Sequence, residues 1–426
     1  METLVTSGAR PAKDQRAPDL FIVESRLWTV KGHEIDHVIE FARAAKVCAP
    51  QQRIVALTAP QDEALAARLQ QTKAIDLAVS CFRHRRIVED DGGPFDILRK
   101  SVQDAVSLRA AILRHRSSRR VTLFFATFAL HAILMVAFLR LTAPWLQVRT
   151  IGILRKNTVN TARQLSRKYR VLRRSLIGRV VWWLATKETI GFTDSHILQR
   201  LQREHLGLET GLVPVLTPGV WDVLPEGDAP GPRRDGPQTV GFIGEPGAGR
   251  GFDLFVLTAL AMEEERRSGQ VEFLAVMLPS YEITPDAVHY MDAFHQGLPG
   301  MRLELRWMPT PADFVAQMKR ADILWNVYAP GVFTQGTSGR LVHGMCLGKK
   351  IVCSSWEWAE AVVRPCSRMR LVEPRLEQTV AAIRALSAAE SDDASRQETQ
   401  RWRETYSREA WDRFVADALE RCERAR

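Results

Sequence analysis

Glycine and arginine gather after one hydrophobic run in the second half of the chain. The run ends at Gly244, and Gly249, Arg250 and Gly251 follow it before a helical pattern begins. Glycines let backbone N–H groups approach an anion, a helix N-terminus adds a favourable dipole, and a guanidinium can hydrogen-bond phosphate oxygens. The pattern therefore predicts a phosphate site. A tight turn between a strand and a helix, with no ligand, is the alternative.

Two commoner nucleotide motifs do not fit this loop. A Walker loop needs a Lys and a Ser or Thr, which Arg250 and Gly251 replace here, so magnesium-ATP chemistry is not expected. The dinucleotide fingerprint is not met either, because its glycine spacing differs from that of Gly247, Gly249 and Gly251.

A second polar loop precedes another helix further along the chain. A strand is expected to end near Asn326, and Gln335, Thr337, Ser338 and Gly339 follow it where the helix begins. Hydroxyl and amide groups at a helix N-terminus can form an anion site. Ordinary N-capping by Thr337 or Ser338 explains this segment equally well. Two such helix starts in one domain favour a diphosphate ligand.

Short apolar runs alternate with amphipathic stretches, which indicates an α/β protein with parallel sheets. In the N-terminal half the expected strands are Leu20–Val23, Ile54–Leu57, Leu77–Cys81, Val121–Ala126, Val148–Ile153, Thr189–Phe192 and Val213–Leu216. The expected helices there are Asp36–Lys46, Gln61–Gln70, Ile97–His115, His131–Leu141, Thr158–Leu176 and Ser195–His205. In the C-terminal half the expected strands are Thr239–Ile243, Val271–Val276, Arg302–Leu305, Ile323–Asn326, Lys350–Cys353 and Met369–Val372. The helices expected between them are Phe252–Ser268, Pro285–Gln296, Thr310–Arg320, Ser338–Leu347, Trp356–Val363 and Leu376–Ala388.

A change of composition marks the expected domain boundary. Residues 218–238 hold five prolines and four glycines without a periodic apolar pattern, which is typical of a linker. The prediction is a flexible tail over 1–17, an N-terminal domain over 18–217, the linker over 218–238, a C-terminal domain over 239–392 and a helical segment over 393–426. Two doubly wound Rossmann-like domains are expected to face a cleft, where the carboxyl ends of such strands bind ligands.

Positive charge is concentrated in one part of the chain. No Asp or Glu occurs from residue 105 to 187, while seventeen Lys or Arg do. Such a field favours anionic partners, and solvated helix faces are the alternative. Nucleic acid is not expected, because aromatic residues are few there and no recognition motif is present. The basic side chains expected to face an anionic acceptor or a membrane are Arg163, Arg167, Lys168, Arg170, Arg173 and Arg174.

Export and membrane insertion are not expected. The first residues lack the apolar stretch of a secretory signal, and the six cysteines form no CxxC pair, which favours reduced thiols in the cytoplasm. Residues 121–139 carry no formal charge and reach the length of a short membrane span. Thr122, Thr127 and His131 interrupt this stretch, so a buried strand followed by a core helix explains it better.

Together these segments resemble the GT-B glycosyltransferases, in particular the large retaining group called family 4. Gly244 to Gly251 is similar to that family's strand–loop–KG segment, with Arg250 in the place of its phosphate-contacting Lys. Ser338 to Val352 is similar to its signature helix. The resemblance covers residues 239–372 well, extends to the segment 193–218 at the end of the family's first domain, and is loose before that.

The resemblance also suggests roles for single residues. The family carries two glutamates eight positions apart, and Gln335 and His343 stand there in this chain. A neutral amide can hydrogen-bond sugar hydroxyls, and His343 could reach a ribose. Gly32 and His33 follow the first strand and resemble the family's glycine-bearing loop, with His33 as an acid, base or acceptor contact. A solvent-exposed His at a helix start is the alternative for His33. His131 lies one helical turn beyond the position of a family histidine, and burial is the alternative there.

The resemblance implies a glycosyltransferase that uses a nucleotide-diphosphate sugar as co-substrate. Arg250 would supply the charge that a metal supplies elsewhere, so no metal or other cofactor is expected. The expected acceptor is a lipid-linked molecule or a polysaccharide, and the acid-free span suggests an enzyme docked on the inner face of the membrane. A glycosyltransferase-like partner subunit without catalysis is the alternative. The candidate catalytic residues are His33, Arg250 and Gln335. The candidate donor-binding residues are Gly32, Gly244, Gly249, Arg250, Gly251, Gln335, Thr337, Ser338, Gly339 and His343.

Overall fold

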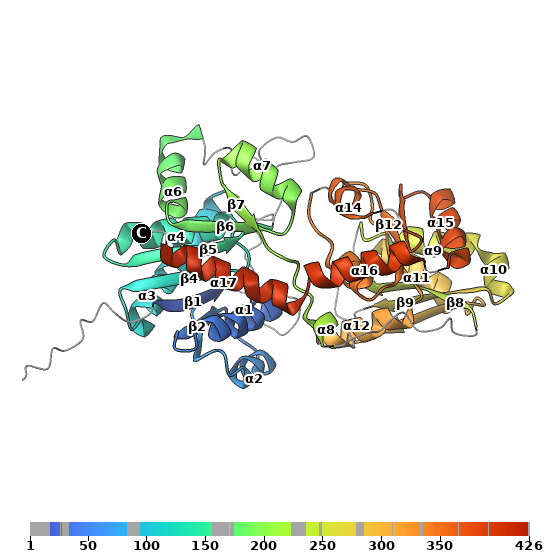
Figure 1. Cartoon of the computed structure of the whole chain (residues 1–426), viewed down its shortest axis with the longest axis horizontal. Coiled ribbons are helices and arrows are strands. Elements are labelled where there is room, and N and C mark those ends of the chain that lie inside the picture. Colours follow the sequence, from blue (N-terminus) through green and yellow to red (C-terminus); the bar gives the residue numbers. More distant parts are fainter. Residues whose placement is uncertain are drawn as a thin grey trace, which may run out of the picture. The chain divides into compact units, whose positions relative to one another are not determined.

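Two parallel β-sheets, each covered by helices, make up the computed structural model of the chain (Figure 1). The structure describes residues 18–25, 27, 34–82, 94–155, 170, 174–222, 236–246, 249–277, 285–308, 310–331, 335–364, 366–390 and 392–424. The chain divides into two compact units. The first unit comprises the described parts of Met1–Leu154, Arg167–Phe192 and Val415–Arg426, and the second those of Arg155–Ser166 and Thr193–Phe414.

The first sheet has seven strands in the order β3-β2-β1-β4-β5-β6-β7. Its inner strands are continuous apolar runs because helices cover both faces of a parallel sheet. Every residue of β1 is buried, and Leu20 to Glu24 pair with Ile54 to Thr58 of β2. The strands are β1 (Asp19–Glu24), β2 (Ile54–Thr58), β3 (Leu77–Ser80), β4 (Arg120–Phe125), β5 (Gln147–Ile153), β6 (Thr189–Thr193) and β7 (Thr210–Leu212).

Right-handed crossovers place the helices of the first unit on two faces. The chain moves one way along the sheet from β1 to β3 and the other way from β3 to β6, so the helices of these two stretches lie on opposite faces. On one face, α4 packs against both α3 and α6. The helices are α1 (Glu34–Cys48), α2 (Glu63–Gln71), α3 (Pro94–His115), α4 (Leu130–Thr142) and α6 (Leu176–Thr186).

The second sheet has six strands in the order β10-β9-β8-β11-β12-β13. One apolar core lies on each face of this sheet, with Leu341 and Trp402 in one and Phe255 and Trp325 in the other. The strands are β8 (Gln238–Gly244), β9 (Val271–Met277), β10 (Met301–Leu305), β11 (Ile323–Asn326), β12 (Lys350–Ser354) and β13 (Met369–Val372). The helices of this part of the chain are α7 (His196–Leu206), α8 (Pro218–Trp221), α9 (Phe252–Ala261), α10 (Glu263–Arg267), α11 (Pro285–His295), α12 (Pro311–Arg320), α13 (Gly339–Cys346), α14 (Glu357–Val362), α15 (Leu376–Ala388) and α16 (Asp393–Thr405). The last helix, α17 (Arg408–Arg424), begins in the second unit and ends in the first, which contains its residues from Val415 onward.

The apolar stretch 121–139 is a strand followed by a core helix, as predicted. Strand β4 and helix α4 share it, and His131 is buried at the start of α4. Within the described ranges, no helix combines the length and apolar character that a membrane span requires.

One expected strand is wrong, and one expected helix is interrupted near its predicted end. Residues 213–216 form no strand, and β7 (Thr210–Leu212) takes that place, with Val213 N–H donating to Thr193 O at 2.9 Å. The helix expected over 158–176 does not continue through Ser175. That residue caps α6, a helix that the sequence pattern did not predict, by accepting from Gly178 N–H at 3.0 Å. Most of residues 158–173, and the tail over 1–17, lie outside the described residues.

The division into compact units differs from the domain boundary predicted at the linker. Residues 193–217 group with the second unit instead of the first. Two hydrogen bonds show why: Ser195 Oγ donates to Gln335 O at 2.7 Å, and Thr337 Oγ1 donates to Asp194 Oδ2 at 3.0 Å. Residues 223–235 of the expected linker lie outside the described residues.

Candidate functional site

The candidate site lies in the second unit, at the carboxyl ends of β8 and β11. These strands are neighbours at the centre of the sheet, and the strand order reverses between them. Ligands of doubly wound sheets bind at such a switch point, because the loops after the two strands diverge and leave a crevice. Both polar loops that the sequence analysis singled out follow these two strands, one before α9 and one before α13.

The loop after β8 is held tightly against the end of β11. Gly249 O accepts from Ala329 N–H at 2.9 Å, and Gly251 O accepts from the indole Nε1 of Trp325 at 3.1 Å. Gly251 has φ +71, and a Cβ there would lie 2.1 Å from Val327 O. A side chain at position 251 is therefore excluded by both backbone conformation and contact. This glycine is required by the fold itself, whether or not a ligand is bound.

Gly244 leaves room for a guanidinium that the sequence analysis did not identify. A Cβ at Gly244 would lie 3.2 Å from Nη2 of Arg340, the second residue of α13. The Arg340 guanidinium lies over the rings of Phe242 and Tyr328, with centroids 5.2 and 5.9 Å from Cζ. Burial lowers the pKa of Arg340, and the nearby Arg250 lowers it further, while Tyr328 and Glu245 raise it.

Two arginines and one carboxylate thus lie near the switch point. Arg250 Nη2 lies 3.8 Å from Glu245 Oε2, and the side chains of both are about one-third exposed. Arg340 is close enough to Arg250 for their like charges to interact. Glu245 acts on both positive charges, so within the described part of this site one carboxylate stands against two guanidinium groups. An anion between the two guanidinium groups would relieve their repulsion.

Ser338 caps the N-terminus of α13. Of the two capping residues that the sequence offered, Thr337 and Ser338, the second is therefore the cap. Ser338 Oγ accepts from Leu341 N–H at 3.2 Å and donates to Asn326 Oδ1 at 3.3 Å. The hydroxyl of Tyr328 lies 3.0 Å from both Ser338 Oγ and Asn326 Oδ1. Thr337 donates to Asp194. The hydroxyls of Thr337 and Ser338 are therefore engaged within the protein, and a ligand here would meet the backbone amides of the first turn.

Open space surrounds the glycines of this second loop. A Cβ built on Gly336 or Gly339 would meet no atom within 4 Å. Neither of them has a φ in the left-handed region. Their lack of a side chain is therefore not demanded by packing, in contrast to Gly251. It leaves the first turn of α13 accessible to a ligand.

Gln335 is buried, with 3% of its surface exposed, and among the described residues its side-chain oxygen Oε1 has no hydrogen-bond partner. Its backbone is fixed, because Gln335 O accepts from Ser195 and the next carbonyl, Gly336 O, accepts from Trp356 Nε1 at 3.1 Å. A buried amide oxygen without a donor is costly, so a bound hydroxyl or water is the expected partner. The position predicted to contact the sugar thus presents an unused acceptor.

His343 lies on α13 below this loop. Its Nδ1 donates to Gly339 O at 2.6 Å, and its ring packs edge to face on Phe314, 5.9 Å between centroids. Burial lowers the pKa of His343 below its usual value, which favours the neutral ring at pH 7. A ribose contact through the other ring nitrogen stays a prediction.

Several other predicted residues lie outside the described residues, namely Gly32, His33, Arg163, Arg167, Lys168 and Arg173. His131, the alternative histidine of the first unit, is buried, with Nδ1 2.8 Å from Ser101 Oγ and Nε2 3.3 Å from Asp104 Oδ2. Ser101 and Asp104 are fully buried. This group therefore stabilises the α3–α4 contact and presents no reactive atom at the surface.

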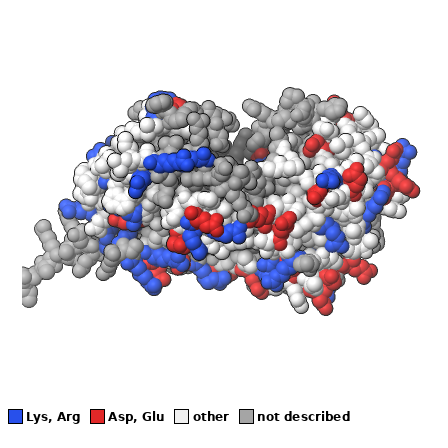
Figure 2. Space-filling model, turned by 90° about the horizontal axis from the view of Figure 1, so that it is seen from above, with Lys and Arg blue, Asp and Glu red and all other residues white. Residues whose placement is uncertain are grey.

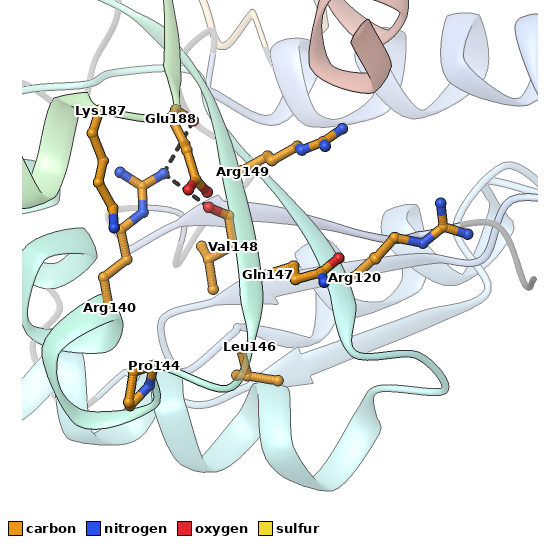
Figure 3. Close-up of a pocket in the computed structure, with 9 residues that line it drawn as sticks. All are labelled: Arg120, Arg140, Pro144, Leu146, Gln147, Val148, Arg149, Lys187 and Glu188. Atoms are coloured by element: carbon orange, nitrogen blue, oxygen red, sulfur yellow. Dashed lines mark hydrogen bonds between the residues drawn. The ribbon is translucent and has the colours of Figure 1, made fainter. Parts of the chain in front are cut away.

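A cavity of about 560 Å³ lies at the amino ends of β5 and β6 in the first unit (Figure 3). The Arg140 guanidinium fills one side of it and donates to Val148 O at 2.9 Å and Glu188 O at 3.0 Å. Arg120 and Arg149 point away from Arg140 in Figure 3, so the cations of this cavity do not converge on one point. Among the described residues, no group of three or more His, Cys, Asp or Glu side chains is arranged to hold a metal ion.

Comparison with solved structures identifies the fold. A glycosyltransferase from Rickettsia africae superposes with a TM-score of 0.65 at 12% identity, covering 95% of this chain and 99% of that one. The chain has a GT-B fold. HepE of Anabaena, solved in complex with UDP and glucose, gives a TM-score of 0.60 at 12% identity over 95% of this chain and 100% of its own. The UDP-forming α,α-trehalose-phosphate synthase of Burkholderia vietnamiensis gives 0.62 at 13% identity over 95% and 98%. No protein-family model and no curated protein sequence matches the chain.

Proposed function

We propose that this protein is a glycosyltransferase that takes its sugar from a nucleotide-diphosphate donor bound at the switch point of the second unit. The observation that carries the proposal is that Arg250, after β8, and Arg340, in the first turn of α13 beside Gly244, both lie at the ends of β8 and β11. Two guanidinium groups and a helix N-terminus suit a diphosphate, whose charge is spread over two phosphates. The GT-B fold is consistent with this assignment.

In this proposal the arginines act on the leaving group. When the bond from the sugar to the diphosphate breaks, negative charge grows on the diphosphate. Arg250, Arg340 and the amides of α13 are already oriented toward that charge, so they stabilise it without reorganisation. Two fixed guanidinium groups would supply what a divalent cation supplies in other transferases, and we propose a reaction without metal or other cofactor.

Gln335 is assigned to the transferred sugar. Its unpartnered Oε1 can accept a hydrogen bond from a sugar hydroxyl, which a glutamate would also do. Glu245, near Arg250, is a second hydrogen-bond acceptor at the same edge of the sheet, and we assign it to a hydroxyl group of the donor. His33 is proposed to act on the acceptor side, and we propose a lipid-linked or polysaccharide acceptor of cell-surface glycan synthesis, used in the cytoplasm.

The first experiment is a thermal-shift series on the purified chain with UDP, GDP, ADP and their sugars. A nucleotide at 100 times its dissociation constant adds about 2.7 kcal/mol to the free energy of unfolding, which moves the melting temperature by a few degrees. Arg250→Ala is expected to abolish the shift. Arg267→Ala, an exposed arginine of α10, is the matched control and is expected to keep it. A wild-type protein that no nucleotide stabilises would overturn the donor site.

A non-catalytic partner subunit is the second candidate. The observation that favours it is the absence of a carboxylate at positions 335 and 343, where Gln335 and a neutral His343 stand. Both candidates predict nucleotide binding, so transfer distinguishes them. Release of nucleoside diphosphate from the stabilising donor, with or without added acceptor, supports the transferase. Tight donor binding with no release over hours, by a protein that melts normally, supports the partner subunit.

A further inference from the structure

Helix α6 of the first unit carries large apolar side chains that face outward. Leu176 is 76% exposed, Val180 49% and Trp183 58%. Their spacing of four and three residues places them on one stripe of the helix. The buried residues Gly178 and Trp182 lie on the opposite side of the helix, against the body of the unit. Contiguous exposed apolar surface of this kind marks an interaction site in a soluble protein.

The outward orientation of this stripe is fixed by Arg140 of α4. Its Nη1 donates to Leu184 O at 2.8 Å and Ala185 O at 2.9 Å, the carbonyls of the last turn of α6. At the other end, Ser175 caps the helix. Figure 3 shows the Arg140 guanidinium beside β5, with its hydrogen bonds to Val148 O and Glu188 O. Because both ends are held, α6 cannot turn its apolar stripe inward without breaking buried hydrogen bonds.

Positive charges border the stripe. Arg174 and Arg179 are exposed, and Lys187 Nζ lies 5.0 Å from the centroid of the Trp183 ring. No acidic residue occurs from 105 to 187, and Glu188 follows Lys187 directly, so the cations of α6 outnumber the carboxylates of its own segment. Figure 2 shows Lys and Arg side chains bordering uncharged surface on the first unit, in the left part of the view.

Exposed apolar side chains also occur at and just beyond the end of α4, the helix that packs against α6. Leu141 is 66% exposed and Trp145 is 51% exposed. Two exposed tryptophans and a flanking cation form the combination that lies at the boundary between lipid headgroups and acyl chains.

We propose that α6 and the end of α4 dock the protein on the surface of an anionic lipid bilayer. The stripe Leu176, Val180 and Trp183 enters the boundary between headgroups and acyl chains, while Arg174, Arg179 and Lys187 contact the anionic headgroups. A second copy of the chain is a poorer occupant, because a symmetric pair of these helices would place Arg174, Arg179 and Lys187 of both copies at one interface, whereas anionic headgroups complement these charges. This inference concerns the first unit alone and does not depend on sugar transfer.

The test is co-sedimentation of the full chain with vesicles of phosphatidylcholine alone and of phosphatidylcholine mixed with phosphatidylglycerol. We expect binding to the mixed vesicles that weakens as salt is added. Arg174→Ala combined with Arg179→Ala is expected to lower the partition coefficient about 25-fold, from about fivefold for each interfacial cation. Leu176→Ser combined with Val180→Ser is expected to lower it about tenfold or more.

A matched pair of tryptophans controls for nonspecific effects. Trp183→Ala is expected to weaken binding, whereas Trp307→Ala, which changes a 43% exposed tryptophan of the second unit, is expected to leave it unchanged. Each variant is first checked for a wild-type melting temperature. The proposal is overturned if the wild-type protein does not bind the anionic vesicles, or if the two tryptophan variants bind them equally well. It is also overturned if the apolar variants disrupt a dimer and leave lipid binding unchanged. None of these measurements involves a nucleotide, so their outcome is independent of the test of the donor site.

Discussion

Two glycines of the candidate site are expected to respond in opposite ways to the same added methyl group. Gly251 lies at φ +71, and its Cβ would be 2.1 Å from Val327 O. Gly339 begins α13, and its Cβ would meet no atom within 4 Å. If our assignment is right, Gly251→Ala damages the fold, whereas Gly339→Ala damages only ligand binding.

The magnitudes follow from these environments. For Gly251→Ala the left-handed conformation costs about 1–2 kcal/mol, and relieving the overlap with Val327 O adds about 1–3 kcal/mol. A loss of about 3 kcal/mol in the free energy of unfolding is expected. For Gly339→Ala the helix gains at most about 1 kcal/mol, because alanine is a better helix former than glycine. Its methyl group would stand where a phosphate is proposed to approach the α13 amides, and losing one hydrogen bond to a charged group costs about 1.5–3 kcal/mol, or about 10- to 150-fold in affinity.

Three measurements on each variant separate these effects. Urea unfolding gives global stability, amide hydrogen exchange over Phe252–Ala261 gives the local stability of α9, and calorimetry gives the affinity for the nucleotide diphosphate. Our reasoning is refuted if Gly251→Ala unfolds within about 0.5 kcal/mol of wild type. It is also refuted if Gly339→Ala is the more destabilised of the two, or binds the nucleotide as wild type does.

Three further predictions rest on single groups. Arg340→Gln is expected to weaken nucleotide-diphosphate binding about 10- to 150-fold by calorimetry, because it removes a charged donor from the site; unchanged affinity would remove Arg340 from the site. Burial raises the pKa of Asp36 to about 6, despite the opposing effect of Arg68. Its folded form therefore holds a proton that the unfolded chain has lost, and the free energy of unfolding should fall by about 3 kcal/mol between about pH 4 and 6. Asp36→Asn should flatten that slope in urea midpoints, and a persistent slope would contradict the assignment. Burial raises the pKa of the Cys346 and Cys353 thiols to about 12, so a thiol reagent at pH 8 should modify the exposed Cys48 and spare both until urea is added.

The local pattern of apolar and polar residues was sufficient to predict most strands and helices of the second unit. Its strands are continuous apolar runs because both faces of the sheet are covered, and each expected strand from Thr239 to Val372 is present within a few residues. The loop at Gly249–Gly251 was recognisable because it combines glycines with a cation at the end of such a run. The strand predicted at Val213–Leu216 is absent from the structure for a related reason. Four apolar or neutral residues in a row can equally be a buried irregular segment, and Val213 is held by a single backbone bond to β6.

The orientation of side chains required the tertiary structure. Arg340 is one of many basic residues in the sequence, and nothing in the local pattern distinguishes it. Its guanidinium reaches Gly244 only because β8 and β11 are neighbours in the sheet, although two other strands separate them along the chain. The same holds for the hydroxyl of Ser338, whose partners Asn326 and Tyr328 come from the end of another strand.

The fold class, the glycine–arginine loop after β8 and the one-sided charge of residues 105–187 could be recognised in the sequence alone, because hydrophobic periodicity, glycine spacing and charge are properties of neighbouring residues. The tertiary structure decided which of those residues share a site and which face outward. The apolar residues of α6 show the difference. In the sequence LIGRVVWWLAT, Trp182 and Trp183 are equivalent neighbours. Only packing on α4, anchored by Arg140, buries the first and exposes the second, because burial depends on what lies across from a side chain and not on its own polarity.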